Sequence, residues 1–279
     1  MNARAPSPSW RIRALWVGPR MTELEWASLA SFVHHGAEVE LFSDRPRSVP
    51  RGVIVSDAST LLRKVIRYGP RSGRHAGSLA ISADLARVTA LKRYGGWWTD
   101  TDVICLKPFA PIDSGFRVGW ETDTNTEPHR ARAAVGVIRA DRGDPIVNRL
   151  YERGHYPLFG SPWEHPLRRL WNVWAYRDTW WSPGNVPWGH TAGPRALTNA
   201  LRHYGRLAEV LPREAFYPVR WEDWASIPKM STEALHALAS TSYAVHLWAD
   251  AYAAASVDRG RAIAEAAWSA PYLEGFRSS

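Results

Sequence analysis

The chain has 279 residues, of which 45% are hydrophobic and 22% charged. These proportions exclude a disordered or collagen-like protein and leave ample chain for a buried core. Its formal net charge is +8, and its single cysteine, Cys105, excludes a disulfide framework and a metal site built only from cysteines.

The first part of the chain predicts alternating strands and a helix after a flexible tail over residues 1–10. An apolar run that ends in Gly-Pro predicts a buried strand at 12–18, and apolar residues at helical spacing predict a helix at 22–35. Alternating apolar and polar residues predict a strand at 37–43, and another strand is expected at 52–58. Strand, helix and strand joined by short connections are typical of an α/β sheet.

The rest of the chain continues with the same kinds of element. Apolar residues at helical spacing, followed by Gly95, predict a helix at 79–94. The further predicted elements are strands at 97–106, 116–123, 133–140, 207–211 and 242–248, and helices at 144–153, at 194–204 and after the last strand. We expect a mobile surface loop at 67–77 and an irregular, tryptophan-rich segment at 155–194. Because the chain has no internal repeat and no linker-like segment, a single domain is expected.

Asp100 and Asp102 form the most informative pair of residues in the sequence. They follow Gly95-Gly96 in the strand predicted at 97–106, and side chains two residues apart in an extended segment point to the same side. Carboxylate oxygens suit Mg²⁺ or Mn²⁺ better than Zn²⁺. Two carboxylates also leave coordination positions open for a substrate diphosphate. The pair therefore predicts a divalent cation site.

A second pair, Asp84 and Arg87, lies three residues apart on the predicted helix at 79–94. Side chains at this spacing are neighbours on one helix face, here opposite much of the apolar stripe. Taken alone, the two residues are expected to form an ion pair on the surface.

Together these residues resemble the signature of glycosyltransferases with a D-x-D motif. The resemblance is to the family called the sugar-binding region containing DXD, which includes yeast-type mannosyltransferases, α-1,4-glycosyltransferases and the catalytic domains of clostridial glucosylating toxins. The family pattern is S-D-x-x-R followed by Y-G-G-x-Y-x-D-x-D. This chain has one residue inserted between Ser82 and Asp84, keeps Arg87 and Tyr94-Gly95-Gly96, and has Trp98 in place of the second tyrosine.

The resemblance implies a GT-A-like nucleotide-sugar-binding fold, of the α/β class, with a mixed, mostly parallel sheet flanked by helices. It implies a single domain over residues 11–279, with a donor-binding half at about 11–110 and an acceptor half at about 111–279. The implied reaction transfers a sugar from a nucleotide-diphosphate sugar, a UDP- or GDP-sugar, to an acceptor hydroxyl. The implied cofactor is Mn²⁺ or Mg²⁺, and the implied stereochemistry is retention of configuration.

The implied metal ligands are Asp100, Asp102 and His246. His246 belongs to the segment Val-His-Leu-Trp, which is similar to the H-x-W segment of the family. Trp248, at the end of that segment, is then a neighbour of the donor phosphates.

The implied donor contacts come from four further residues. Trp16, in a segment similar to the first strand of the family, would stack on the nucleobase, and Trp98 would lie near the donor. Asp84 and Arg87 would hold the sugar hydroxyls, so that Asp84, Arg87 and Asp102 are the implied catalytic residues.

Candidate acceptor residues are Glu121, Asp123, Gly193 and Pro194, because they lie in segments that follow strands, where loops carry binding groups. An inverting reaction would require a general base, for which Glu121 and Asp123 are the candidates. The segment 132–135 departs from the Asn-Ala pair of many relatives and leaves the acceptor open. A glycan, a lipid-linked saccharide and a small natural product all remain candidates.

Two other classes of function remain open. One is a nucleic-acid- or membrane-surface-binding module that uses arginine charge and tryptophan stacking, and the other is a metal-dependent nucleotidyl or phosphoryl transferase. We expect no nucleic-acid partner, because the arginines are spread over the whole chain. The tryptophans at 160–190 suit a sugar-stacking wall, a lipid-facing wall or a satellite core. Lacking an apolar run of about 20 residues and an apolar N-terminal signal, the chain is expected to be cytoplasmic, with peripheral contact at the inner membrane face left open.

Overall fold

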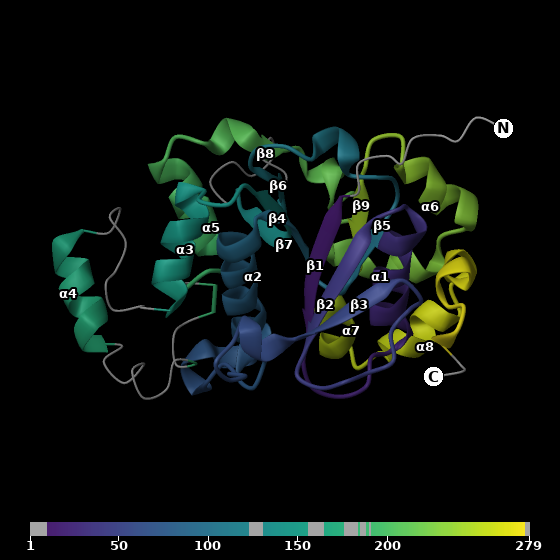
Figure 1. The fold of residues 1–279 in the computed structure, drawn as a ribbon, viewed down its shortest axis with the longest axis horizontal. Coiled ribbons are helices and arrows are strands. Elements are labelled where there is room, and N and C mark those ends of the chain that lie inside the picture. The colour runs from purple at the N-terminus through teal and green to yellow at the C-terminus, as the bar shows by residue number, and fades with distance from the viewer. Residues whose placement is uncertain are drawn as a thin grey trace. The chain divides into compact units, whose positions relative to one another are not determined.

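The structure, a computed structural model, describes residues 10–122, 131–155, 165–175, 184, 188–189 and 191–276 (Figure 1). The chain forms two compact units, each assembled from separate stretches of sequence. The first unit comprises Met1–Ser56, Thr99–Ser114 and Arg213–Ser279, and the second comprises Asp57–Trp98 and Gly115–Pro212.

The first unit begins with three strands, β1 (Arg11–Trp16), β2 (Glu38–Ser43) and β3 (Val53–Asp57), in the order β3-β2-β1. Strands β1 and β2 are parallel, and Trp16 at the end of β1 lies opposite Ser43. Between them runs helix α1 (Glu23–His34), which begins with a capping box formed by Thr22 and Glu25. The strand-helix-strand connection predicted from the sequence is therefore present.

A second, two-stranded sheet in the same unit carries the functional candidates. Strand β5 (Val103–Cys105) pairs antiparallel with β9 (Ala244–His246), and this register places Val103 opposite His246. The other edge of β5 is covered by helix α1. The hydroxyl of Ser28 donates to the carbonyl of Val103 at 2.7 Å and accepts from its N–H at 3.2 Å, and Ser31 accepts from the N–H of Cys105 at 2.9 Å. Two serines thus take the place of a neighbouring strand.

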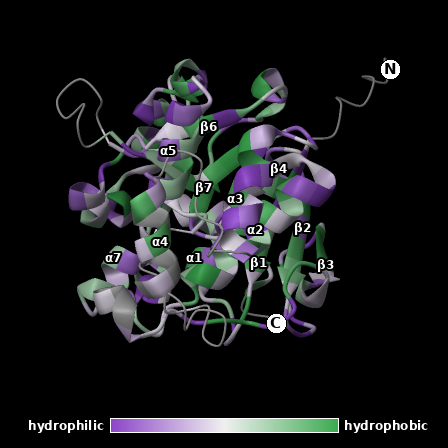
Figure 2. Cartoon of the chain, turned by 90° about the vertical axis from the view of Figure 1, so that its left-hand side faces the viewer, coloured by the Kyte–Doolittle hydropathy of each residue, from purple (hydrophilic) through white to green (hydrophobic). Residues whose placement is uncertain are grey.

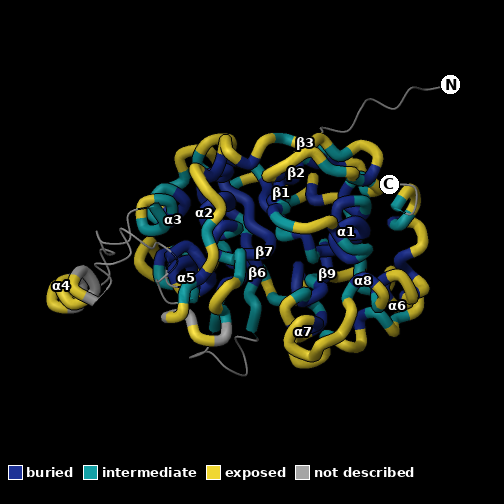
Figure 3. Tube along the Cα trace, turned by 90° about the horizontal axis from the view of Figure 1, so that it is seen from below, coloured by how far each residue is buried: buried dark blue, intermediate teal, exposed yellow. Residues whose placement is uncertain are grey.

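The C-terminal part of the first unit packs around α1. Its helices are α6 (Thr232–Leu238), α7 (Ala249–Ala254) and α8 (Arg259–Ala264), with 3₁₀ segments at Trp221–Lys229 and Ala267–Tyr272. Much of α1 is buried (Figure 3). The helix is contacted by α8, β2, β5 and the last 3₁₀ segment.

The second unit contains β4 (Gly96–Thr99), β6 (Arg117–Trp120), β7 (Ala133–Ala140) and β8 (Val210–Leu211), in the order β4-β7-β6-β8. All eight residues of β7 are buried, and β7 is drawn largely in the hydrophobic colour in Figure 2. Its helices are α2 (Ala80–Tyr94), α3 (Pro145–His155), α4 (Pro166–Ala175) and α5 (Pro194–His203). Helix α5 packs on β7, and α3 contacts both α2 and α5.

The α/β class and the mixed sheet flanked by helices are confirmed, since β6 is antiparallel to β7 but parallel to β8. Most predicted elements are present within a few residues of the expected bounds, and β7 has the predicted bounds. No helix among the described residues is long and apolar enough to cross a membrane.

Five predicted segments differ from the structure. In the strand predicted at 207–211, Leu207–Glu209 forms a 3₁₀ turn and only Val210–Leu211 is a strand. The prediction of one strand at 97–106 is wrong, because the segment forms two strands: β4 ends at Thr99 and β5 begins at Val103. The predicted loop at 67–77 contains short 3₁₀ turns over Pro70–His75, and the predicted irregular segment contains α4. The single C-terminal helix is two helices, α7 and α8. Helix α6 was not predicted, although Ser231 before it is a typical N-cap residue.

Removing the hydroxyl that covers the edge of β5 tests this part of the fold. In Ser28→Ala the N–H and C=O of Val103, a residue with no exposed surface, lose their partner. We expect the free energy of unfolding, measured by urea denaturation, to fall by about 2–4 kcal/mol. Ser226→Ala is the control, because that exposed hydroxyl donates to the backbone of Asp223, and we expect a change within about 0.5 kcal/mol. Equal losses in the two variants would contradict the role of Ser28.

Candidate functional site

The structure brings together Asp100, Asp102 and His246, the three predicted metal ligands, in the first unit. One ligand atom from each residue lies within 4.8 Å of the others, and all three residues are half-buried. Both aspartates lie in the turn between β4 and β5, and His246 is the last residue of β9. The pairing of Val103 with His246 is what places the imidazole beside the turn.

The aspartates do not share one side of an extended strand, as the sequence spacing predicted. The chain turns at Asp100, Thr101 and Asp102 instead, so that the carboxylates lie on a turn that faces the end of β9. A continuous apolar pattern on both sides of the motif concealed this break.

Asp102 is held by the segment that follows β9. The N–H of Ala249 donates to its Oδ2 at 3.0 Å, and the N–H of Leu247 donates to its backbone carbonyl at 2.7 Å. His246 Nε2 lies 3.3 Å from its Oδ1. Burial raises the pKa of the Asp102 carboxyl above its ordinary value, while His246 acts in the opposite direction. Removing this carboxylate from water therefore costs free energy, which a bound cation would offset.

Trp248 orients the imidazole through its backbone. It has a φ of 58°, in the left-handed region that bulky side chains rarely adopt. Its N–H donates to His246 Nδ1 at 3.1 Å, and its indole Nε1 donates to the carbonyl of Val219 at 3.1 Å. Because Nδ1 accepts, the proton of the neutral imidazole lies on Nε2 and faces Asp102. Trp248 is buried, and its predicted contact with donor phosphates stays a prediction.

Trp16, the predicted base-stacking residue, lies at the end of β1 and is half-buried. Its indole Nε1 donates to the carbonyl of Pro19 at 2.8 Å. The guanidinium of Arg259 lies 5.8 Å from the centre of the ring and forms an ion pair with Glu25 at 2.8 Å. A cation over the ring and a fixed indole N–H hold Trp16 in one orientation.

Asp84 and Arg87 form a buried ion pair within the second unit, and the expectation of a surface pair is wrong. Their exposed fractions are 6% and 2%, and Arg87 Nη1 donates to Asp84 Oδ1 at 2.6 Å. The guanidinium also lies 5.8 Å from the ring centre of Trp98, which is itself buried. The pattern of apolar and polar residues along α2 does not predict this burial, because other parts of the unit also cover the polar face of the helix.

The N-terminus of α5 approaches Asp84 from the other side. Gly193 is the N-cap, and a Cβ at this position would lie 3.2 Å from Asp84 Oδ2 and 2.8 Å from the Cα of Gly189. A glycine is therefore needed here, and the positive end of the helix dipole lies near the carboxylate. The predicted acceptor residue Gly193 thus lies beside the residue predicted to hold the donor sugar, and Pro194 follows it as the first residue of α5.

Tyr68 completes this group and was missed from the sequence. Its hydroxyl donates to Asp84 Oδ2 at 3.5 Å and accepts from the N–H of Gly189 at 3.5 Å. Burial, followed by the charge of Asp84, raises the pKa of Tyr68 well above its ordinary value, so the hydroxyl keeps its proton. The available signal was a tyrosine within a basic, glycine-rich stretch, but the stretch was predicted to be a surface loop.

The remaining acceptor candidates lie after β6. Glu121 is half-buried, and its N–H donates to the carbonyl of Arg132 at 2.8 Å. Asp123 lies outside the described residues.

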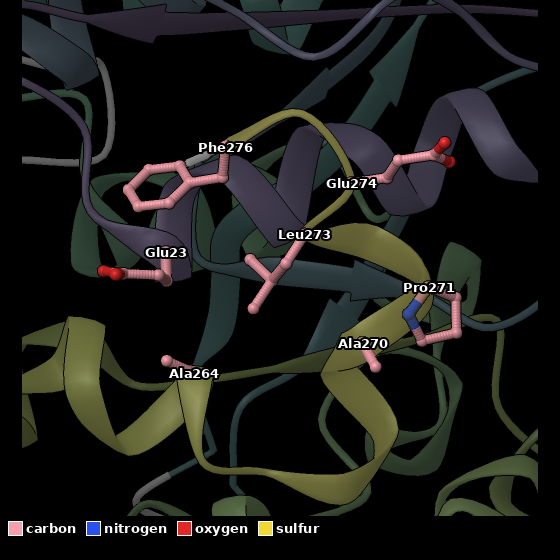
Figure 4. A pocket seen from close by; sticks show the side chains of 7 residues that line it. All are labelled: Glu23, Ala264, Ala270, Pro271, Leu273, Glu274 and Phe276. Carbon is pink, nitrogen blue, oxygen red and sulfur yellow. The ribbon is translucent and has the colours of Figure 1, made fainter. Parts of the chain in front are cut away.

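A pocket elsewhere in the first unit lies between the start of α1 and the C-terminal turns (Figure 4). None of the predicted site residues lines it. Its lining residues are Glu23, Ala264, Ala270, Pro271, Leu273, Glu274 and Phe276. Two carboxylates among apolar side chains form no donor set that matches the predicted chemistry.

Two stretches of the chain match known protein families. Residues 65–118 match the glycosyltransferase sugar-binding region containing DXD motif, and residues 188–268 match the alpha 1,4-glycosyltransferase conserved region. The first stretch includes Tyr68, Asp84 and Asp102, and the second includes Gly193 and His246. The resemblance to glycosyltransferases with a D-x-D motif is therefore confirmed.

Curated relatives agree with the family matches. The lactosylceramide 4-alpha-galactosyltransferase of Mus musculus is 28% identical over 183 residues, which cover 61% of this chain and 41% of that protein. The protein of the same name from Homo sapiens is 26% identical over 182 residues, which cover 61% of this chain and 42% of that protein. The chain thus spans about four tenths of the length of these two relatives.

Solved structures with a similar arrangement include a PaToxG glycosyltransferase, with 17% identity and a TM-score of 0.44, covering 70% of this chain and 69% of that chain. Another is the ligand-free glycosyltransferase domain from the YGT toxin, with 9% identity and a TM-score of 0.49. That match covers 78% of this chain and 82% of the toxin domain.

The buried ion pair leads to a stability prediction. Arg87→Met removes the cation and leaves the buried Asp84 carboxylate without its strongest partner, so we expect a loss of about 3–5 kcal/mol in the free energy of unfolding. Urea denaturation measures the loss.

Glu152→Gln provides the matched control. Arg149 and Glu152 have the same i,i+3 spacing and a distance of 2.8 Å, but the Glu152 side chain is 51% exposed. We expect a change of less than about 1 kcal/mol. A similar loss of unfolding free energy in both variants would show that burial does not determine how much stability is lost when an ion pair is broken.

Proposed function

We propose that the protein is a glycosyltransferase that moves a sugar from a nucleotide-diphosphate sugar to an acceptor hydroxyl with the help of a divalent metal ion. The convergence of Asp100, Asp102 and His246 carries this proposal. These residues come from two stretches that separately match glycosyltransferase families.

The donor set fits Mn²⁺ or Mg²⁺. Asp100 and Asp102 supply hard carboxylate oxygens, and His246 supplies an imidazole nitrogen, a ligand that Mn²⁺ accepts more readily than Mg²⁺. A metal held by His246 Nε2 would use the lone pair of that nitrogen, so the proton of the neutral imidazole would lie on Nδ1, which then could not accept from the Trp248 N–H. When bound, the metal neutralises the negative charge that grows on the diphosphate leaving group as the glycosidic bond breaks.

The other residues of the chain bind and orient the donor. Asp84 accepts from sugar hydroxyls, while Arg87 and Tyr68 fix the position of its carboxylate. The ring of Trp16 binds the nucleobase by stacking on the face not covered by Arg259. The N-terminal amides of α5, next to Asp84, add donors for an oxygen of the substrate.

The acceptor is proposed to be a saccharide linked to a lipid. The support is the name of the curated relatives, which act on lactosylceramide, together with the matched alpha 1,4-glycosyltransferase region. We further propose retention of configuration, as the family resemblance implies. In a retaining reaction by front-face attack, a donor phosphate oxygen takes the acceptor proton, so no separate protein base is required.

Ligand-induced stabilisation tests the donor and the metal. We expect Mn²⁺ together with a UDP- or GDP-sugar to raise the melting temperature by roughly 5 °C when the ligand is present at about 100 times its Kd. In the double variant Asp100→Asn, Asp102→Asn the shift is lost, because neutral amides bind the cation far less tightly. Differential scanning fluorimetry with and without Mn²⁺ measures the effect.

Asp223→Asn is the control for this experiment, since it removes an exposed carboxylate elsewhere in the first unit and leaves the shift unchanged. Stabilisation by nucleoside triphosphates but by no nucleotide sugar would instead indicate nucleotidyl or phosphoryl transfer.

Product analysis tests the reaction itself. With the donor that stabilises the protein and a lactose-terminated glycolipid, we expect a product with the anomeric configuration of the donor, read from the anomeric proton coupling in NMR spectra. Asp84→Asn lowers kcat by at least about 100-fold, because the buried carboxylate that holds the sugar is neutralised. Glu152→Gln keeps the activity of the parent protein. An inverted product would contradict the proposal and direct attention to Glu121 as a general base.

A further inference from the structure

Helix α4 presents large apolar side chains to solvent. Leu167, Leu170, Trp171 and Trp174 are 70%, 67%, 55% and 64% exposed, and Figure 3 draws most of the described part of α4 as exposed. Their spacing of three, one and three residues places all four on one side of the helix. Single exposed apolar residues are ordinary, but four adjacent ones form a continuous surface that costs free energy in water.

The composition of this helix is that of an interfacial helix. Its described residues, Pro166–Ala175, include two arginines, at positions 168 and 169, and no acidic residue. Tryptophan and leucine on one side of a short, basic helix suit the boundary between lipid headgroups and acyl chains. The helix is also far too short to cross a bilayer.

We propose that the apolar side of α4, formed by Leu167, Leu170, Trp171 and Trp174, docks on the surface of an anionic lipid bilayer. The apolar side chains enter the headgroup region, and the positive charge of the helix attracts anionic headgroups. This inference goes beyond the proposed function and does not depend on it. If the acceptor is lipid-linked, docking also brings the enzyme to the surface where its acceptor resides.

The charge of the helix favours a lipid surface over a second copy of the chain. The described residues of α4 include two arginines and no carboxylate, so two copies packed against each other would repel one another and offer no opposite charge from this helix. The formal net charge of +8 adds long-range repulsion between copies and attraction to an anionic surface.

Vesicle flotation with the whole 279-residue chain tests the proposal. We expect binding to vesicles of phosphatidylcholine and phosphatidylglycerol at low salt, and weaker binding to phosphatidylcholine alone. The double variant Trp171→Ser, Trp174→Ser lowers the partition coefficient at least about tenfold, because the apolar anchor is lost. The double variant Arg168→Gln, Arg169→Gln lowers the partition coefficient on anionic vesicles about 25-fold, because each lost charge weakens binding roughly fivefold. It has little effect on binding to neutral vesicles.

Trp221→Ser is the matched control, because Trp221 is 40% exposed in the first unit and lies outside α4. It leaves vesicle binding unchanged, and all variants are expected to keep the parent melting temperature, since exposed side chains contribute little to folding. The proposal is overturned if the parent protein does not bind anionic vesicles, or if Trp171→Ser, Trp174→Ser binds as tightly as Trp221→Ser. It is also overturned if size-exclusion chromatography shows a dimer that the tryptophan variant dissociates while vesicle binding is absent, since the occupant would then be a second copy.

Discussion

The candidate metal site depends on one pairing of short strands. β5 follows the two aspartates and β9 ends at His246, and the register that sets Val103 opposite His246 brings ligands from distant parts of the sequence within reach of one cation. Two strands of three residues each make few hydrogen bonds. Ser28 and Ser31 of α1 therefore matter, because they satisfy the free edge of β5 and tie it to a well-buried helix.

Each of the two units maintains arrangements that are costly in isolation. The Asp102 carboxylate is removed from water, Trp248 adopts a left-handed backbone conformation, and Asp84 and Arg87 are buried as a pair. Each is stabilised by specific neighbours: the Ala249 amide, the Val219 carbonyl, and Tyr68 with the N-terminus of α5. Such concentrations of strain and buried charge are typical of functional sites, where geometry is maintained at the expense of stability.

Local sequence patterns predicted the elements that depend on local contacts. The helix at 79–94 and the strand at 133–140 match α2 and β7, since apolar spacing and a following glycine act within one element. The prediction of a single strand at 97–106 was wrong, because a run of apolar residues does not show where the chain turns. Helix α4 was missed although its apolar residues have helical spacing, because prolines and tryptophans nearby favoured an irregular segment.

By itself the sequence determined the chemical types at the site: paired carboxylates after Gly-Gly, an Asp–Arg pair on a helix, and a C-terminal histidine beside a tryptophan. The tertiary structure alone decided that His246 meets Asp100 and Asp102, that Asp84 and Arg87 are buried, and that Tyr68 and Gly193 adjoin Asp84. The reason is physical. Residue type and short spacing are local properties, whereas burial and long-range contacts depend on strand register and helix packing, which involve segments far apart in the chain.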